Sequence, residues 1–382
     1  MSDSGRLTRA KKFIRDAAIV LAVSLGLLIA LELLLRLVAP QELTGESVRG
    51  ERFSTIDPEL GMRYMPHAVW RFRHPEYRAE YAINADGFRD TREHPERKSP
   101  GVTRVLLLGD SFTFGQGSDY DQIWPVLAER ELERQGLKVE LVKAGIQGMD
   151  TRSELVLLRR LVKRYDPDAV VVGFLINDFY TNIPHSESTN RPELEEIQGR
   201  VFPRGHRTQY HLVTLARRIV AASDAAYVSL YLRAGNVGNY FKLPLSPEAR
   251  RQVETTETLL RQMAAYCDSI ARPLVIFSMP QQFQILYPRS GRADPGIDVD
   301  YPDRHLSQLA AANGFEWVSA RESFVNAAEI SDQDLFYRLD GHFTPAGNKV
   351  AAQVFVEHVV PRVLARAREA KRSSPAATSR QR

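Results

Sequence analysis

The chain has 382 residues, of which 43% are hydrophobic and 26% charged, enough for one large globular domain or two smaller ones. This composition excludes a globally disordered chain, because apolar residues are frequent enough to form a core. The formal net charge of +4 hides an asymmetry, since basic residues concentrate in residues 1–16 and 362–382 while the segment between them is acidic. A nucleic-acid enzyme would carry basic residues on its main domain, so nucleic acid is not an expected partner.

The N-terminus predicts a basic cytoplasmic segment, residues 1–16, followed by a transmembrane helix over residues 17–39. The run Ala17–Leu31 is almost wholly apolar, and with its flanks it supplies the roughly 20 residues needed to cross a bilayer. Positive residues before the helix predict a single-pass protein of the bacterial inner membrane whose main domain is periplasmic. A cleaved signal peptide is the alternative, but its small-residue cleavage site is missing. Glu32 is expected either to face a partner helix or to lie near the interface beside Arg36.

Residues 40–102 are expected to form a small extracytoplasmic β appendage and a linker. Aromatic and polar residues alternate in the stretch WRFRHPEYRAEYAIN, which favours one or two short strands. The charged, proline-containing stretch Arg92–Pro100 is typical of a connector.

Residues 103–367 are expected to form one α/β domain, because strand patterns alternate with helix patterns. The strands are predicted at 105–108, 139–142, 169–172, 274–279 and 315–318, and the helices at 123–134, 151–165, from Ser246-Pro247 onward, 305–313 and 345–367. Such alternation implies a central parallel sheet with helices on both faces. Ligands of such sheets lie beyond the carboxyl ends of the strands, which is where the chemistry is expected.

The alternation stops between residues 180 and 245. A helical pattern over 211–232, with an apolar stripe at Leu212, Leu215 and Ile219, predicts an insertion that could form a cap over the site. Residues 368–382, which are basic and rich in Ser and Ala, are expected to be a disordered tail.

Ser111 is the candidate nucleophile. In the stretch VLLLGDSFTFGQG it follows an apolar run that predicts a buried strand, and it begins a glycine-spaced turn. A serine there can expose its hydroxyl while nearby backbone N–H groups point at one spot, which suits an oxyanion. The alternative is that Asp110 or Ser111 only caps a helix. A phosphate-binding loop is excluded because no Gly-Lys-Ser/Thr follows.

Three further stretches contain the partners that a nucleophilic serine needs. Gly145 can offer an unobstructed backbone N–H, and Asn177 in GFLINDF can add a side-chain amide donor. His342 in RLDGHFTPAG can act as general base, with Asp340 orienting its ring. Each residue alone is more often a turn, cap or structural residue, so only their joint order along the chain is specific.

In that joint order the sequence resembles the SGNH/GDSL hydrolase family, whose blocks carry Ser, Gly, Asn and His. The matching residues are Ser111 in GDS, Gly145 in AGIQG, Asn177 in LIND and His342 in DGHFTPAG. The resemblance covers residues 103–367. It implies a flavodoxin-like, three-layer α/β/α fold with a serine that cleaves esters or transfers acyl groups.

The sequence departs from the family pattern at two positions. Many members place the triad aspartate three residues before the histidine, where this chain has Leu339, so Asp340 is the expected third member. Its Asp-x-His spacing resembles the branch that acts on cell-surface polysaccharides. Lys143 stands where many members carry Asn, so hydrogen bonding around Gly145 is expected to differ. Asp178, beside the expected oxyanion donor, is expected to orient its loop without a catalytic role.

The expected function is that of a membrane-anchored serine esterase acting on O-acyl, chiefly O-acetyl, esters of envelope glycans or lipid-linked intermediates. Ser111, His342 and Asp340 are the expected catalytic residues, and the Ser111 N–H, the Gly145 N–H and Asn177 the expected oxyanion hole. No metal or organic cofactor is required. The expected partners are the acylated substrate, the membrane and proteins of envelope polysaccharide assembly. Two alternatives stay open: an O-acyltransferase with the same site, and a non-catalytic glycan-binding scaffold.

Overall fold

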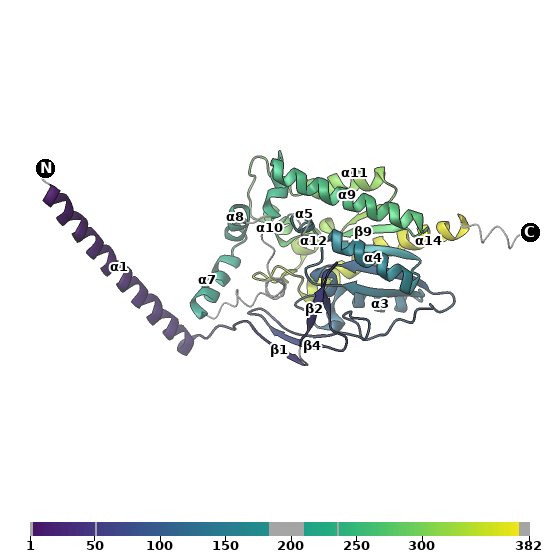
Figure 1. The fold of residues 1–382 in the computed structure, drawn as a ribbon, viewed down its shortest axis with the longest axis horizontal. Coiled ribbons are helices and arrows are strands. Elements are labelled where there is room, and N and C mark those ends of the chain that lie inside the picture. Colours follow the sequence, from purple (N-terminus) through teal and green to yellow (C-terminus); the bar gives the residue numbers. More distant parts are fainter. Residues whose placement is uncertain (1–2, 50–51, 183–209, 235–236, 374–382) are drawn as a thin grey trace, which may run out of the picture.

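A parallel sheet forms the centre of the computed structural model, which describes residues 3–49, 52–182, 210–234 and 237–373 (Figure 1). Its strands are β6 (Thr103–Gly109), β7 (Val139–Gly145), β8 (Ala169–Phe174), β9 (Leu274–Ser278) and β10 (Glu316–Ser319). They lie in the order β7-β6-β8-β9-β10, which is the 2-1-3-4-5 order of flavodoxin-like sheets. The expected α/β fold with a central parallel sheet is confirmed.

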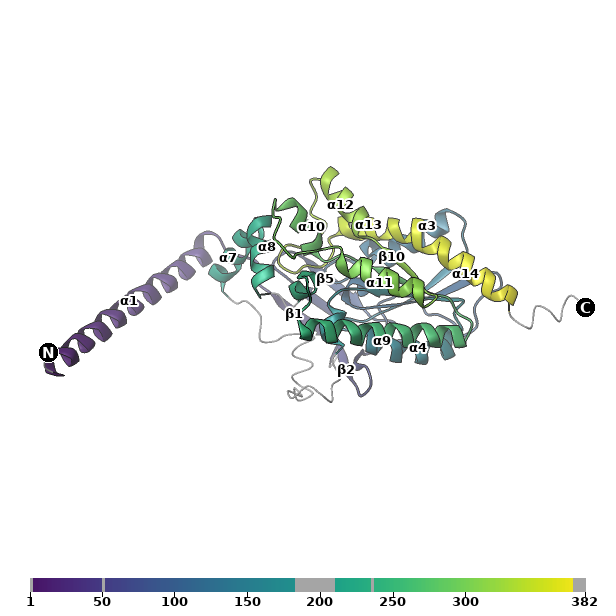
Figure 2. The ribbon, with the colours of Figure 1, turned by 90° about the horizontal axis from the view of Figure 1, so that it is seen from above.

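Helices cover both faces of this sheet, because its strands are apolar on both sides. One face carries α4 (Thr151–Tyr165), α9 (Pro247–Ser269) and α11 (Tyr301–Ala312), and the other carries α3 (Trp124–Arg134), α12 (Arg321–Ile330), α13 (Pro345–Val354) and α14 (Val360–Ser373) (Figure 2). Alternate residues of β6 belong to the hydrophobic cores on the two faces of the sheet. Leu106 and Leu108 pack in one core, and Val105 and Leu107 pack in the other. The result is three layers.

Helix starts follow local capping signals. The Asp150 side chain accepts a hydrogen bond from the Ser153 N–H at the start of α4, and Ser246 accepts one from the Ala249 N–H at the start of α9. The sequence pattern missed α10 (Gln282–Arg289) and α12. Within α10 the first turns are rich in glutamine and Pro288 lies near the end, so neither a clear apolar period nor an ordinary stop signal marks this helix.

Three neighbouring strands end in glycine at the same level of the sheet, since Gly109 pairs with Gly145 on one side and Gly173 on the other. A Cβ on Gly109 or Gly173 would lie 2.1 or 2.3 Å from Thr113 Oγ1, and one on Gly145 would lie 2.6 Å from the backbone of α2 (Ser111–Phe114). Only glycine therefore lets this short helix rest directly on the strand ends.

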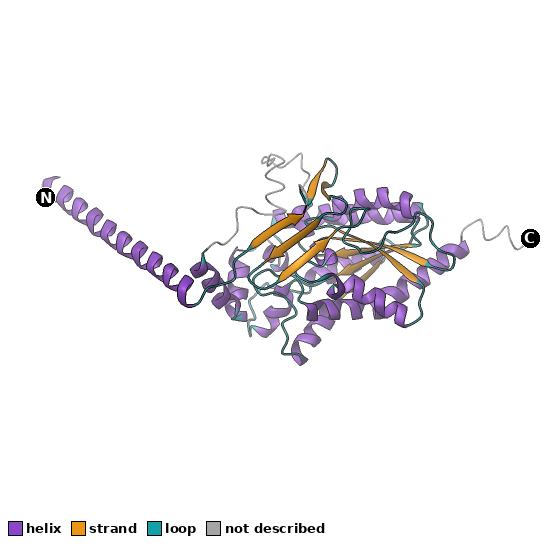
Figure 3. Ribbon diagram, turned by 90° about the horizontal axis from the view of Figure 1, so that it is seen from below, coloured by secondary structure: helices purple, strands orange, loops and turns teal. Residues whose placement is uncertain are grey.

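Residues 41–101 contain more strands than the one or two expected. β1 (Gly45–Arg49), β4 (Val69–Arg73) and β5 (Arg78–Ala82) form an antiparallel sheet, and β2 (Ser54–Asp57) pairs with β3 (Gly61–Tyr64) (Figure 3). The pattern missed three strands because polar residues dominate them. Buried aromatic side chains of this segment, including Trp70 and Tyr81, belong to the same core as Leu106 of β6, and Tyr81 packs on Phe114 with ring centroids 5.1 Å apart.

In the described part of the insertion at residues 180–245 lie α7 (His211–Ala221), α8 (Asp224–Ala234) and a short 3-10 helix (Val237–Phe241), where a single helix over 211–232 was expected. The expected apolar stripe is not buried throughout, since Ile219 is 65% exposed. Residues 183–209 lie outside the described residues, and so does whatever part of the expected cap they would form.

The two ends of the described chain are helical. α1 (Asp3–Val38) projects from the body (Figure 1) and contains an apolar section, Lys11–Val38, that is long enough to cross a membrane. At the other end, a π-helical turn (Phe355–Val359) joins α13 to α14, which continues to Ser373. Residues 368–373 are therefore helical rather than disordered. The rest of the expected tail, 374–382, lies outside the described residues.

Candidate active site

Ser111 lies at the carboxyl end of β6 as the first residue of α2. Asp110, and not the serine, caps this helix, because its side chain accepts a hydrogen bond from the Phe112 N–H at 2.9 Å. This leaves the Ser111 hydroxyl available to other partners. Burial raises the pKa of the Asp110 carboxyl to about 6, although the Phe112 N–H and the nearby His342 favour its charged form.

His342 brings the C-terminal part of the chain to Ser111. Its Nε2 lies 2.7 Å from Ser111 Oγ, and its Nδ1 lies 2.7 Å from Asp340 Oδ2. The loop that carries both residues ends at α13, where Thr344 accepts a hydrogen bond from the Gly347 N–H. The Phe112 ring packs on the imidazole with centroids 4.7 Å apart, which fixes the orientation of the ring. The structure thus brings the three expected catalytic residues together in hydrogen-bond succession.

Burial and the neighbouring opposite charge shift the pKa of each residue of this pair in opposite directions. Burial disfavours the imidazolium, but the neighbouring Asp340 carboxylate outweighs it and raises the pKa of His342 above its usual value. Burial likewise disfavours the Asp340 carboxylate, yet His342 and a hydrogen bond from it lower the pKa of Asp340. Both side chains keep a small exposed fraction, 16% for His342 and 14% for Asp340, so the site is partly open to solvent. The arrangement favours a charged aspartate beside an imidazole that accepts protons readily.

The expected oxyanion donors lie on the strands beside β6. Gly145 ends β7 directly opposite Gly109, against the backbone of α2. Asn177 follows β8 and precedes α5 (Asp178–Thr181); its Nδ2 lies 3.5 Å from Asp110 Oδ2, and its buried Oδ1 has no hydrogen-bond partner among the described residues. Both donors therefore belong to the same edge of the sheet as Ser111. No hydrogen bond joins either of them to Ser111 among the described residues.

Sequence reasoning missed the contribution of the N-terminal strands. Glu76, in the turn between β4 and β5, accepts hydrogen bonds from the backbone N–H groups of Leu339 and Asp340 at 2.9 and 3.1 Å. Burial raises the pKa of the Glu76 carboxyl, although these two N–H groups favour its charged form. The carboxylate acts as a fixed acceptor for the loop that carries the aspartate. No local signal marked it, because the contact joins segments far apart in the chain.

The loop after α2 is held by buried groups from the same N-terminal segment. The guanidinium of Arg89 donates hydrogen bonds to the carbonyl oxygens of Phe114, Gly115 and Ser118. Tyr81 Oη accepts a hydrogen bond from the Gly117 N–H at 3.0 Å. These contacts fix the backbone that follows the serine, so residues 41–101 support the site directly.

A second chain of side-chain contacts links the three blocks that carry Ser111, Gly145 and His342. Tyr64 of β3 accepts a hydrogen bond from the Gln147 N–H and donates one to its Oε1. Gln147 Nε2 donates to Gln116 Oε1 at 2.7 Å, and Gln116 Nε2 lies 3.5 Å from Asp340 Oδ1. The Gly145 block and the Asp340 loop are connected in this way.

Lys143 is involved in packing beneath α3 rather than in bonding around Gly145. Its Nζ lies 2.9 Å from both Asp90 Oδ2 and Glu129 Oε2, and all three side chains are almost fully buried. Burial opposes its charge, but the two carboxylates raise the pKa of Lys143. The lysine is the centre of a buried ion cluster that ties the linker before β6 to α3 and β7.

Asp178 is fully buried and accepts a hydrogen bond from Thr151 Oγ1 at 2.7 Å. Burial, with Asp110 and Asp150 nearby, raises the pKa of Asp178 well above its usual range. The contact ties the segment that bears Asn177 to the start of α4, which agrees with the orienting role expected for Asp178.

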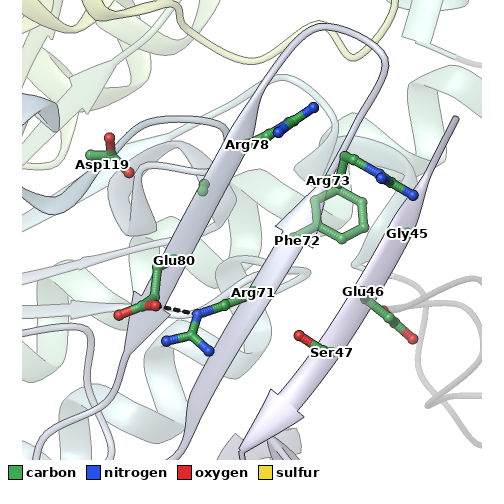
Figure 4. A pocket seen from close by; sticks show the side chains of 10 residues that line it. Gly45, Glu46, Ser47, Arg71, Phe72, Arg73, Arg78, Glu80 and Asp119 are labelled. Atoms are coloured by element: carbon green, nitrogen blue, oxygen red, sulfur yellow. Dashed lines mark hydrogen bonds and ion pairs between the residues drawn. The ribbon is translucent and has the colours of Figure 1, made fainter. Parts of the chain in front are cut away.

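A cavity of about 500 Å³ lies away from the serine, on the β1-β4-β5 sheet. Figure 4 shows its charged lining, which includes Arg71, Arg73, Arg78 and Glu80, with an Arg71–Glu80 ion pair across it. Ser111 does not line this cavity. No group of three or more His, Cys, Asp or Glu side chains that could hold a metal ion occurs in the described part of the chain.

Residues 107–350 match the model of the GDSL-like lipase/acylhydrolase family, more than half of the chain and all the blocks described above. The chain belongs to this family. The expected family is confirmed, and the expectation of an ester-cleaving enzyme agrees with it. The chain is also similar to an arylesterase of Vibrio mimicus, with 29% identity over 86 residues. That match covers 22% of this GDSL-family chain and 43% of the relative, so it spans less than half the length of the arylesterase.

Solved structures of esterases are similar to this GDSL-family chain at low identity. The psychrotrophic esterase EstA of Pseudoalteromonas is 12% identical, with a TM-score of 0.39; the match covers 69% of this chain and 99% of EstA. A variant of Axe2, an acetylxylan esterase of Geobacillus stearothermophilus, is 15% identical, with a TM-score of 0.40; the match covers 69% of this chain and 96% of that protein.

Proposed function

We propose that the protein is a membrane-anchored serine esterase that acts on O-acyl, chiefly O-acetyl, esters of envelope glycans or lipid-linked intermediates. The observation that carries the proposal is the succession of 2.7 Å contacts from Ser111 Oγ through the His342 ring to Asp340 Oδ2. This succession is what a nucleophilic serine requires, since the hydroxyl is weak until a neighbouring base takes its proton.

The reaction proceeds in two steps. His342 takes the Ser111 proton as Oγ attacks the ester carbonyl, and the imidazolium then gives that proton to the departing alcohol. The resulting acyl-serine is attacked by water, activated by the same imidazole, and the acid is released. Asp340 stabilises the imidazolium in both steps without itself taking the proton.

The negative charge that develops on the carbonyl oxygen needs hydrogen-bond donors. The Ser111 and Gly145 N–H groups and the Asn177 side chain supply them in this proposal, because all three lie at the carboxyl edge of the sheet. The absence of side-chain bulk at Gly145, forced by the approach of α2, keeps that N–H accessible.

The anchor in this proposal is α1. Within its section Lys11–Val38, the apolar 18-residue window contains no residue buried by the rest of the protein, as suits a helix whose surroundings are lipid. The proposed arrangement is a cytoplasmic segment at 1–16, the membrane span at 17–39, the β segment and linker at 40–102, and the periplasmic catalytic domain at 103–367 with its insertion at 180–245. Retention in the membrane pellet after carbonate extraction, with an intact N-terminus, is the expected result; a soluble, shortened protein would refute the anchor.

The glycan or lipid-linked substrate follows from where the anchor would hold the site, and from the Asp-x-His spacing of Asp340 and His342, which resembles the polysaccharide-modifying branch. Mass spectrometry of envelope glycans, from cells with the native protein and from cells with Ser111→Ala, distinguishes ester hydrolysis from acyl transfer. Added acetyl groups in the variant support hydrolysis, and lost acetyl groups support transfer.

Catalysis is tested on the full chain in detergent with p-nitrophenyl acetate. Ser111→Ala is expected to abolish turnover, while the matched variant Ser307→Ala, on the exposed side of α11, retains it. Covalent labelling of the native protein by a fluorophosphonate, lost in Ser111→Ala, separates an enzyme from a non-catalytic scaffold. Turnover that survives in Ser111→Ala would refute the proposal.

A further inference from the structure

The helix α7 leaves three of its large apolar side chains exposed, which is unusual for a helix packed on a core. Its buried positions are Thr214 and Ala221, and Leu212 and Leu215 are half-buried. By contrast, Val213 is 45%, Ile219 65% and Val220 39% exposed. Amphipathic helices of globular proteins normally turn their large apolar side chains inward. An outward apolar face of this kind indicates a surface that contacts another protein or a membrane.

The anchor helix α1 contacts this same helix (Figures 1 and 2). Glu32 caps the start of α7: its carboxylate accepts hydrogen bonds from the His211 N–H at 3.1 Å and the Leu212 N–H at 2.8 Å. Among residues 11–38, only Glu32 and Leu35 are half-buried, and the others are exposed. The contact therefore lies in the last turns of α1, before Val38.

The position of Glu32 along α1 fixes the level of α7 relative to a bilayer. A hydrocarbon core takes about 20 helical residues, so a span that begins at Ala17 reaches its far boundary near Arg36, one turn beyond Glu32. Arg36 then lies at the membrane interface, and Glu32, its ion-pair partner at 2.9 Å, lies one helical turn below it. The start of α7 lies at that level too, because Glu32 bonds directly to its first N–H groups.

We propose that α7 is an interfacial helix whose face formed by Val213, Ile219 and Val220 lies in the membrane surface beside the end of α1. This inference rests on the proposed anchoring by α1. Interfacial helices place an apolar face roughly 5–10 Å into the boundary between headgroups and acyl chains and carry basic residues at its edge. Arg217, which is exposed one turn after Val213 at the edge of this face, supplies such a charge for anionic headgroups.

The other side of α7 is tied to the catalytic loop. Arg218 donates hydrogen bonds to Gln41 Oε1 and to the carbonyl oxygen of Pro75, the residue before Glu76. A cavity of about 360 Å³ lies between α7 and the loop, lined by Glu76, Arg218, Ala221, Ala222, Asp334, Arg338 and Leu339. With α7 in the membrane surface, this cavity and the loop of Asp340 lie on the bilayer side of the domain. An ester carried by a lipid or bound at that surface would reach the site from this side.

Cysteine labelling of the full chain tests the inference. The native Cys267 is buried, and burial raises the pKa of its thiol to about 12, so labels attach to introduced cysteines. An environment-sensitive fluorophore is placed at Val213→Cys or Ile219→Cys, and at Ala365→Cys as control. Ala365 is exposed on α14. This helix lies at the end of the molecule opposite α1 (Figure 1).

The labelled proteins are reconstituted into vesicles of phosphatidylethanolamine and phosphatidylglycerol, and quenching by aqueous iodide is measured. The inference expects quenching several-fold weaker at 213 and 219 than at 365, with blue-shifted emission at the two α7 positions only. Equal quenching at all three positions in protein that floats with the vesicles would overturn the inference and leave the anchor intact. Protein that fails to float would instead overturn the anchor, and the inference with it.

Unchanged hydrolysis of p-nitrophenyl acetate in detergent shows that each labelled variant is folded, since none of the three positions touches the catalytic residues. A second measurement avoids the label altogether: the triple variant Val213→Ser, Ile219→Ser, Val220→Ser is expected to expose the Arg218–Ala222 segment to added protease in vesicles. Protection equal to that of the native chain would contradict an α7 held by lipid contacts.

Discussion

Glu76 Oε2 lies 3.1 Å from the backbone nitrogen of Asp340, although 264 positions separate the two residues in the chain. Glu76 belongs to the N-terminal strands, outside the residues that match the family model. The loop that carries the proposed triad aspartate is thus held from a segment that is not part of the family's core. The N-terminal β segment is a structural part of the active site.

Replacing Glu76 tests this support. Glu76→Ala removes the acceptor of two partly buried N–H groups, so kcat is expected to fall and the free energy of unfolding to drop by about 1–3 kcal/mol. Glu76→Gln retains a carbonyl acceptor, so it is expected to keep most of the native kcat and most of the native free energy of unfolding. Kinetics on p-nitrophenyl acetate and urea unfolding in detergent measure the two effects. Equal losses in both variants would show that the negative charge, rather than the acceptor, matters.

The Asp340 carboxylate predicts a particular pH profile. His342 must be neutral to take the serine proton, so kcat/KM falls as the pH drops through the pKa of His342, which Asp340 raises. Asp340→Asn removes the main cause of that rise, so the acid limb of the profile is expected to move to lower pH. In the same variant kcat is expected to fall by about 10²- to 10⁴-fold. An acid limb that stays in place would exclude the pairing of these two residues in catalysis.

Asn177→Ala tests the proposed oxyanion donor. A donor that acts mainly in the transition state affects kcat far more than KM, and its loss typically costs about 10²- to 10³-fold in kcat. The control is Asn313→Ala at the end of α11, where the side chain only bonds to the Leu309 carbonyl. A rise in KM alone would assign Asn177 to substrate binding instead.

Lys143→Met tests the buried ion cluster. Removing the lysine takes away the cation that Asp90 and Glu129 share and leaves them only His94 and Arg92 as basic neighbours. This loss is expected to lower the free energy of unfolding by about 3–5 kcal/mol. Lys138→Met is the matched control, because Lys138 is exposed. Urea unfolding followed by far-UV circular dichroism compares the two. Similar stabilities would mean that the cluster relaxes to admit water.

Local pattern identified the central sheet because each of its strands is an apolar run that stops at a recognisable signal, as Val105–Leu108 does at Gly109. Capping residues such as Ser246 located helix starts in the same way. Segments whose burial depends on other segments were harder to predict from the sequence. The strands β1 to β3 are polar in sequence, and no proline or glycine marks the break between α7 and α8. Propensity alone is weak where tertiary contacts decide.

The sequence by itself determined the class of the fold, the family and the identity of the candidate residues, because these depend on residue type and on order along the chain. Only the tertiary structure decided that Ser111, His342 and Asp340 lie within hydrogen-bond reach of one another, that Glu76 holds their loop, that Lys143 is part of an ion cluster, and that α7 turns its apolar face outward beside α1. The reason is physical: such contacts join segments up to 264 positions apart, and their distances are set by the packing of strands and helices, which no local pattern contains.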